Sequence, residues 1–249
     1  MMDYSELFSC AGKRALVVGS SGLLGREVVA GLAAAGADVI GADVAPVLVP
    51  GAVRAVELDI ASEASVAAVF DDVGAVDIVV NCAYPRTADW GADIADVPFD
   101  SFAENLRLHL GGYFLVAREA AMRMAASGGG SIVNFASIYG LVGPTWEVYE
   151  DTNMTMPVAY SAIKGGVINL TRYLATRYGP SGVRVNTVSP GGIEDGQDAA
   201  FIAAYARRAP MQRMALPHEV VGSVVFLASD ASTYVTGHNL VVDGGWTAW

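Results

Sequence analysis

Short apolar runs alternate with segments of helical periodicity along the whole of this 249-residue chain. The runs are apolar throughout, as in strands that are buried on both faces. Such strands, when separated by helices, are typical of a parallel sheet with helices on both sides. Right-handed crossovers then make the sheet doubly wound. We therefore predict one α/β domain over residues 1–249, with a doubly wound, seven-stranded parallel sheet and helices on both faces.

The expected elements are bounded mainly by glycine and proline. Ser62 is the expected N-cap of one helix, and Pro157 and Pro217 are expected in the first turns of two others. Strands are expected at residues 15–18, 39–42, 53–58, 78–80, 132–135, 183–188 and 239–242. Helices are expected at residues 23–35, 62–69, 98–126, 157–178, 199–207 and 217–227.

The composition excludes several classes of partner. A net charge of −11 disfavours nucleic acid and anionic membrane surfaces, which are bound by clustered Lys and Arg. Cys10 and Cys82 are the only cysteines and indicate no disulfide framework. Residues 1–10 lack the pattern of a signal peptide, and no apolar run reaches membrane-spanning length. We expect a cytoplasmic protein with no metal site, whose 53% apolar content favours extensive burial or subunit contacts.

A glycine-rich loop, Gly-Ser-Ser-Gly-Leu-Leu-Gly at residues 19–25, joins the first expected strand to the first helix. Glycines there allow a sharp turn and a close approach of the backbone to a pyrophosphate. The helix N-terminus offers free N–H groups to the same anion. The position in the first βα unit indicates a dinucleotide site and thus a Rossmann fold. The candidate contacts are Gly19, Ser21, Gly22, Leu24 and Gly25.

Two aspartates follow the next strands. Asp43 ends the second strand, where a carboxylate binds the hydroxyls of the adenosine ribose and repels a 2′-phosphate. No Lys or Arg follows it before Arg54, so we expect NAD in preference to NADP. The alternative is a solvated loop aspartate. Asp59 ends the third strand and is placed to meet the adenine amino group, or else to cap the approach to the helix at Ser62.

Tyr160 and Lys164 lie one helical turn apart on the same face of an expected helix. A free tyrosine has a pKa of about 10, too high for a base at neutral pH, and a nearby cation lowers it. Such a pair exchanges a proton with an alcohol or carbonyl while a nicotinamide exchanges the hydride. The pair follows a dinucleotide loop, which favours a catalytic role over a chance helical pair.

With these motifs, the chain resembles the classical short-chain dehydrogenase/reductase family over essentially its whole length. The resemblance implies that Ser137 hydrogen-bonds the reacting oxygen and that Tyr160 is the acid/base. It implies that Lys164 holds the nicotinamide ribose and lowers the pKa of Tyr160. It also implies a homotetramer or homodimer. Further cofactor contacts are implied at Ile60, Asn81, Pro190 and Ile193. The matching segments are residues 19–25, 59–60, 81–83, 131–137, 160–164, 184–186, 190–191, 234–237 and 242–245.

The sequence departs from the family pattern near the site. His109 stands where the family has an asparagine that completes a proton relay. A histidine can bridge a water chain, and its charge state would add a pH dependence; the alternative is a histidine satisfied in the helix interface. Tyr84 replaces a glycine, Asp195 replaces a threonine, and Gly22 lies one place earlier than the commonest spacing.

Residues 140–157 form a longer connection than is usual between the serine and the tyrosine. We expect them to form one wall of the substrate pocket, since long loops in compact domains are usually functional; packing in a subunit interface is the alternative. Their composition suits a polyhydroxylated, sugar-like ligand. The side chains concerned are Trp146, Glu147, Tyr149, Glu150, Asp151, Thr152 and Asn153. Together with residues 84–86 and the tail at residues 245–249, this loop resembles a bacterial subset of the family that is associated with flagellin modification and surface-sugar biosynthesis.

These observations together predict an NAD-dependent oxidoreductase that interconverts a secondary alcohol and a ketone. The alternatives are a non-catalytic NAD-sensing protein and an NADP-dependent reductase of a different carbonyl compound. A lyase or epimerase that uses the nicotinamide transiently is a further class, against which the short C-terminal part argues. The substrate and the physiological direction do not follow from the sequence.

Overall fold

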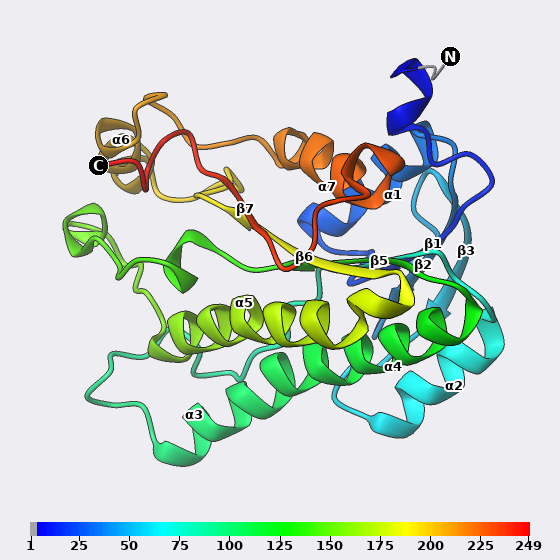
Figure 1. Ribbon diagram of the computed structural model, residues 1–249. Helices are drawn as coiled ribbons and strands as arrows, with labels where there is room; N and C mark the ends of the chain where they lie inside the picture. The colour runs from blue at the N-terminus through cyan, green and yellow to red at the C-terminus, as the bar shows by residue number, and fades with distance from the viewer. Residues whose placement is uncertain (1–3) are drawn as a thin grey trace.

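The computed structural model describes residues 4–249 and confirms the expected α/β fold (Figure 1). One sheet of seven strands has the order β3-β2-β1-β4-β5-β6-β7, and every neighbouring pair is parallel. The order reverses between β1 and β4, which is the switch point of a doubly wound sheet. The strands are β1 (Arg14–Val18), β2 (Asp38–Asp43), β3 (Ala52–Glu57), β4 (Ile78–Asn81), β5 (Gly130–Phe135), β6 (Val183–Pro190) and β7 (Asn239–Val242).

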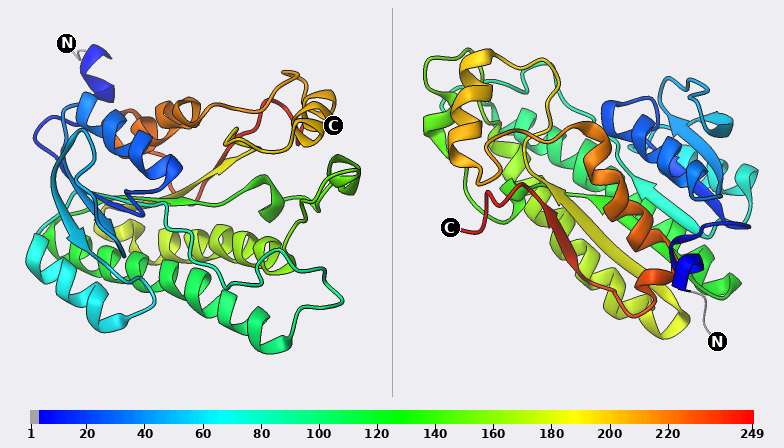
Figure 2. Two further views of the ribbon diagram at one scale, coloured as in Figure 1. Left: turned by 180° about the vertical axis from the view of Figure 1, so that it is seen from behind. Right: turned by 90° about the horizontal axis from the view of Figure 1, so that it is seen from above.

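Helices cover both faces of this sheet, as Figures 1 and 2 show. One face packs against α1 (Leu23–Ala34) and α7 (Val221–Ala228). The other packs against α2 (Glu63–Val73), α4 (Gly112–Ser127) and α5 (Val158–Tyr178). Two short helices, α3 (Phe99–Asn105) and α6 (Ala199–Arg208), lie toward the end of the molecule at which the strands terminate. In residues 4–249 no helix has both the length and the hydropathy needed to cross a bilayer.

The strand patterns reflect their places in the sheet. All four residues of β4, at the centre, are buried, as the apolar run predicted. At the edge, Val56 is the one buried residue of β3, and Val53 is 65% exposed. An edge strand has one neighbour and is only partly covered by helices, so its apolar residues are not all buried.

The helix boundaries agree with the sequence to within one residue, with three differences. The helix expected at 62–69 continues to Val73, about one turn further. The long helix expected at 98–126 contains a π-helical turn, Leu106–Gly111, between α3 and α4. The helix expected at 217–227 begins with a 3₁₀ turn, Pro217–Val220, before α7. The predicted N-cap is confirmed, because the Ser62 side chain accepts a hydrogen bond from the amide of Ser65 at 3.2 Å.

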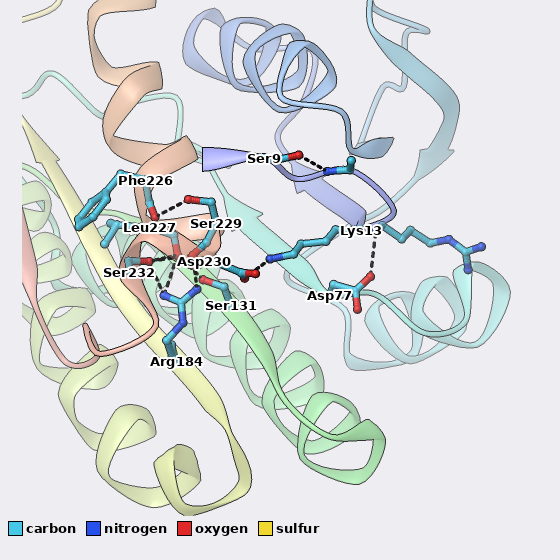
Figure 3. A network of polar contacts seen from close by, with 12 residues as sticks. Ser9, Lys13, Asp77, Ser131, Arg184, Phe226, Leu227, Ser229, Asp230 and Ser232 are labelled. Carbon is cyan, nitrogen blue, oxygen red and sulfur yellow. Dashed lines mark hydrogen bonds and ion pairs between the residues drawn. The ribbon is translucent and has the colours of Figure 1, made fainter. Parts of the chain in front are cut away.

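A half-buried arginine closes the C-terminal end of α7 (Figure 3). Arg184 of β6 donates to the carbonyl of Leu227 at 2.8 Å, to the carbonyl of Ser229 at 3.2 Å and to the Ser232 hydroxyl. The Ser131 hydroxyl of β5 donates to the same Leu227 carbonyl at 2.7 Å. The last carbonyls of a helix lack partners within the helix, so these donors satisfy them and match its negative end.

Replacing this arginine is expected to destabilise the fold. Arg184→Met removes three hydrogen bonds from a charged donor and leaves the carbonyls of Leu227 and Ser229 with only neutral donors. We expect a loss of about 2 kcal/mol and a fall in Tm of about 4–8 °C. Thermal unfolding measures this, with Arg54→Met on the exposed edge strand as the matched control. An equal Tm for the two variants would contradict the capping role.

Candidate active site

One cavity of about 1090 Å³ opens at the carboxyl ends of the strands. Residues at or just after the ends of β1 to β6 contribute to its lining, together with the first turns of α1 and α5. This is the crevice where an open parallel sheet binds its ligands. The sequence-predicted residues that line it are Gly19, Ser21, Gly22, Leu24, Gly25, Asp43, Asp59, Ile60, Ser137, Tyr160, Lys164, Pro190 and Ile193.

The glycine loop forms a backbone cradle in which a side chain at Gly19 or Gly25 would clash with neighbouring backbone atoms. Gly19 has φ +79°, and a Cβ there would lie 2.6 Å from the amide nitrogen of Ala83. At Gly25 a Cβ would lie 2.0 Å from the carbonyl oxygen of Gly19. Gly22 is the N-cap of α1 and offers no side-chain cap, which leaves the first N–H groups of the helix facing the loop. These features fit the pyrophosphate of a dinucleotide.

Asp43 and Asp59 are placed differently beside this cradle. Both line the cavity. The Asp43 carboxylate accepts a hydrogen bond from the amide of Ser21 in the glycine loop at 3.0 Å. The Asp59 carboxylate accepts one from the amide of Ala61 at 2.9 Å. Asp43 is thus tied to the cradle, whereas Asp59 also caps the approach to α2, so both interpretations of Asp59 remain open.

Asn81 does not line the cavity. It is the last residue of β4 at the centre of the sheet and is fully buried. Neither of its side-chain polar atoms has a hydrogen-bond partner among residues 4–249. Cys82 and Ala83 line the cavity instead, because the chain turns toward it only after the strand ends. The geometry therefore gives no support to a cofactor contact from the Asn81 side chain.

Ser137, Tyr160 and Lys164 come together at one place in the cavity. Ser137 follows the end of β5 and is 5% exposed. Tyr160 and Lys164 lie one turn apart on α5, with the Lys164 Nζ 5.6 Å from the Tyr160 ring centroid. The ammonium also donates to the carbonyl of Phe135 at 2.9 Å, which fixes its position below the site.

The expected lowering of the Tyr160 pKa by Lys164 is not what the structure shows. Burial raises the pKa of Tyr160, and the Ser137 hydroxyl beside it lowers the pKa only in part. The rings of Tyr84 and Trp90 stand 5.9 and 6.2 Å from the Tyr160 ring and reduce its contact with water. Burial also lowers the pKa of Lys164 to about 7, so this cation is only partly charged at neutral pH.

His109 lies in the π-helical turn and contacts Lys164 without lining the cavity. Its Nε2 is 3.3 Å from the Lys164 Nζ. Burial lowers the pKa of His109 well below 6.5, and the neighbouring Lys164 adds to this effect. The imidazole is therefore neutral near pH 7, and the expected pH dependence from its charge is wrong. The geometry favours His109 as a residue that positions Lys164.

This neutral state predicts how the pH profile responds to mutation. His109→Asn keeps a polar side chain beside Lys164, so the pH dependence of kcat/KM is expected to be unchanged between pH 5 and 8, the range in which an ordinary histidine titrates. The lowered pKa keeps the imidazole of His109 neutral at pH values where an ordinary histidine becomes protonated. Any inflection of the profile near pH 7 therefore belongs to Lys164. An inflection present in the wild type and absent from His109→Asn would contradict this assignment.

Residues 140–157 form part of the cavity wall, with only some of the expected side chains. Tyr149 and Asn153 line the cavity as expected, together with Met154, Thr155, Met156 and Pro157. Trp146 is 60% exposed, and the acidic side chains of this segment are not among those that line the cavity. The 3₁₀ turn Trp146–Tyr149 turns successive side chains in different directions, so only some of them face inward. Glu147, Glu150 and Asp151 therefore do not supply the expected acceptors.

Trp90 was missed by the sequence reasoning. It belongs to the segment after β4, lines the cavity and donates from its Nε1 to the Tyr84 hydroxyl at 3.1 Å. This segment joins the wall formed by residues 140–157 through the Thr155 hydroxyl, which donates to the carbonyl of Gly91 at 2.6 Å. Figure 2 shows the two segments at the same end of the molecule as α6. The only signal in the sequence was an isolated tryptophan in a polar stretch.

Comparison with curated proteins finds bacterial sequence relatives. Post-translational flagellin modification protein A of Campylobacter coli is 38% identical over 179 residues, which cover 71% of this chain and 70% of the relative. D-threitol dehydrogenase of Mycolicibacterium smegmatis is 34% identical and covers 96% of this chain and 95% of the relative.

Solved structures match the whole fold. A short-chain dehydrogenase from Leptospira borgpetersenii with bound NAD+ has a TM-score of 0.88 and 33% identity, covering 99% of this chain and 96% of the other. A gluconate 5-dehydrogenase from Burkholderia cenocepacia in complex with NADP and tartrate has a TM-score of 0.86 and 30% identity, covering 98% of each chain.

The match to a family model agrees with these likenesses. The model described as enoyl-(acyl carrier protein) reductase matches residues 19–247, from the glycine loop to the C-terminal tail. The chain therefore belongs to the short-chain dehydrogenase/reductase family and is an oxidoreductase that uses a nicotinamide dinucleotide, NAD or NADP.

Proposed function

We propose that the protein interconverts a secondary alcohol and a ketone on a polyhydroxylated, sugar-like substrate, with NAD as the preferred cofactor. The observation that carries the proposal is the meeting of Ser137, Tyr160 and Lys164 in the cavity that also contains the glycine cradle. One domain, residues 1–249, holds the whole site. D-threitol and gluconate dehydrogenases among the similar proteins support a polyol or sugar-acid substrate.

The side chains have complementary roles in oxidation. The Ser137 hydroxyl donates a hydrogen bond to the substrate oxygen and holds it beside the phenol. Tyr160 accepts the hydroxyl proton as the carbonyl forms and returns it in the reverse reaction. Lys164 holds the ribose of the cofactor and is itself held by the Phe135 carbonyl and His109. Bound NAD+ supplies the hydride acceptor and a positive charge that favours the phenolate.

Preference for NAD rests on Asp43. Its carboxylate lines the cavity at the end of β2, beside Val44 and Ala45. A 2′-phosphate placed there would meet a negative charge with no basic side chain in the adjoining lining. Similar structures hold NAD+ or NADP, so this chain's own residues decide the choice.

We also propose a homotetramer or homodimer in the cytoplasm, acting in surface-sugar or flagellin modification. Large apolar side chains on α4 and α5 support an oligomer: Phe114, Met122 and Tyr173 are 41%, 53% and 67% exposed. The flagellin modification relative supports the process. Light scattering on the purified protein tests the assembly, and a monomer would contradict it.

A parallel screen tests the activity. Alditols, aldonates, sugar phosphates and nucleotide sugars are offered with NAD+ and with NADP+, and formation of the reduced cofactor is followed. We expect NADH formation with an alditol or aldonate. Binding of NADH without turnover on any member would favour a non-catalytic NAD sensor, and turnover only with NADP+ would favour the NADP-dependent alternative.

A further inference from the structure

Charged side chains are divided between two parts of the cavity. Five charged residues line it: Asp43, Asp59, Arg86, Lys164 and Asp195. Asp43 and Asp59 follow β2 and β3, on the side of the cradle, and Lys164 is 3% exposed beneath the reacting groups. Arg86 follows β4 and is the solvent-exposed cation of the lining. Among residues 4–249, no carboxylate lies within 4 Å of its guanidinium.

The guanidinium of Arg86 lies close to the reacting phenol. It stands over the ring of Tyr84, 5.4 Å from the centroid. That ring stands edge-on to the ring of Tyr160, at 5.9 Å between centroids. The ring of Tyr84 therefore contacts both the arginine head and the ring of the acid/base, an arrangement that suits two ends of one small substrate. Stacking on Tyr84 limits the positions that the guanidinium adopts.

The segment that carries Arg86 is anchored on both sides. The amide of Thr87 donates to the Asn105 Oδ1 at 3.0 Å, and the Asn105 amide group donates back to the Thr87 hydroxyl at 2.8 Å. Asn105 is 3% exposed at the end of α3. Trp90 holds the Tyr84 hydroxyl from the other side at 3.1 Å. The arginine is thus presented by an ordered support, which reduces the entropy lost on binding an anion.

From this geometry we propose that Arg86 binds a carboxylate of the substrate, so that the substrate class is a hydroxycarboxylic acid. The inference rests on the proposed function, because it concerns the second end of the molecule that Tyr160 oxidises. A guanidinium matches a carboxylate with two parallel hydrogen bonds. Asp195 in the same lining and the net charge of −11 disfavour a dianionic phosphate, for which residues 4–249 place no second exposed cation in the lining.

Binding in the NADH complex tests the assignment without turnover. The probes are tartrate and gluconate, with threitol and glucitol as uncharged counterparts, titrated calorimetrically into the protein saturated with NADH. Arg86→Met keeps the stem and removes the charge. We expect it to weaken binding of the carboxylates by about 10- to 100-fold and to leave binding of the alditols and of NADH unchanged. Arg86→Lys keeps the charge and is expected to restore binding in part.

Arg207→Met is the matched control, since it makes the same change in net charge at an exposed arginine outside the cavity lining. It is expected to bind all four probes as the wild type does. The proposal is overturned if the carboxylates do not bind to the wild type. It is also overturned if Arg86→Met weakens the binding of charged and uncharged probes equally, or weakens the binding of NADH. Glucose 6-phosphate is a fifth probe for the wild type, and tighter binding of it than of gluconate would likewise overturn the proposal. Turnover of alditols alone would retain the proposed function and overturn only the carboxylate site.

Discussion

Replacing Tyr160 by phenylalanine is expected to lower kcat by about 10²- to 10⁴-fold. The phenol is the group that exchanges a proton with the substrate oxygen, and Phe keeps the ring that packs against Tyr84 and Trp90. Binding of NADH and Tm are therefore expected to stay close to their wild-type values. Initial rates, calorimetric binding of NADH and thermal unfolding measure the three quantities on the same preparation.

Tyr139→Phe provides the control for this experiment. Tyr139 also lines the cavity, but its hydroxyl accepts a hydrogen bond from the Tyr149 hydroxyl at 3.2 Å and has no role in the proposed proton transfer. Its kcat is expected to fall far less than that of Tyr160→Phe. Near-normal turnover by Tyr160→Phe, or an equal loss in the two variants, would be incompatible with Tyr160 as the acid/base.

The raised pKa of Tyr160 also fixes the direction of the pH dependence. Oxidation needs the phenolate as base, and burial raises the pKa of this phenol. The rate of alcohol oxidation is therefore expected to rise with pH, whereas ketone reduction, which needs the protonated phenol, is expected to fall. The positive charge of bound NAD+ moves the inflection of oxidation to lower pH than that of the free enzyme.

The parts of the site that the sequence predicts are those whose chemistry depends on local spacing. The glycines of residues 19–25 follow an apolar strand, and only glycine fits at Gly19 and Gly25. Tyr160 and Lys164 share a face because a helical turn separates them, whatever surrounds the helix. Both features are properties of one element, and the structure places both in one cavity.

The parts that it does not predict depend on packing between distant segments. The pKa of Tyr160 is raised by rings from the segment after β4, whose course no periodicity specifies. Asn81 follows the family pattern, yet it is enclosed because β4 lies at the centre of the sheet. The direction of Trp146 is set by a 3₁₀ turn in a segment without strong apolar spacing. Likewise, no signal in the sequence indicates the π-helical turn that places His109.

Exchanging the charge at the end of β2 is expected to reverse the cofactor preference. In the double variant Asp43→Ala/Val44→Arg, the carboxylate that repels a 2′-phosphate is removed and a guanidinium that binds it is added. Val44 is 67% exposed and lines the cavity next to Asp43, so an arginine there has room to reach the ribose. We expect the ratio of kcat/KM for NADP+ to that for NAD+ to rise by about 10²- to 10⁴-fold, since each of the two electrostatic changes contributes about 1.5–3 kcal/mol.

Asp43→Asn separates the charge from the structural role of this residue. The Asp43 carboxylate accepts a hydrogen bond from the amide of Ser21, and an asparagine oxygen keeps that bond to the glycine loop. The single variant is therefore expected to lose discrimination against NADP+ while keeping Tm and the position of the cradle. Two results would contradict this role: equal kcat/KM of the wild type for NADP+ and NAD+, or an unchanged preference in Asp43→Asn. In either case the hydrogen bond to Ser21 is the main role of Asp43, and other residues determine the choice of cofactor.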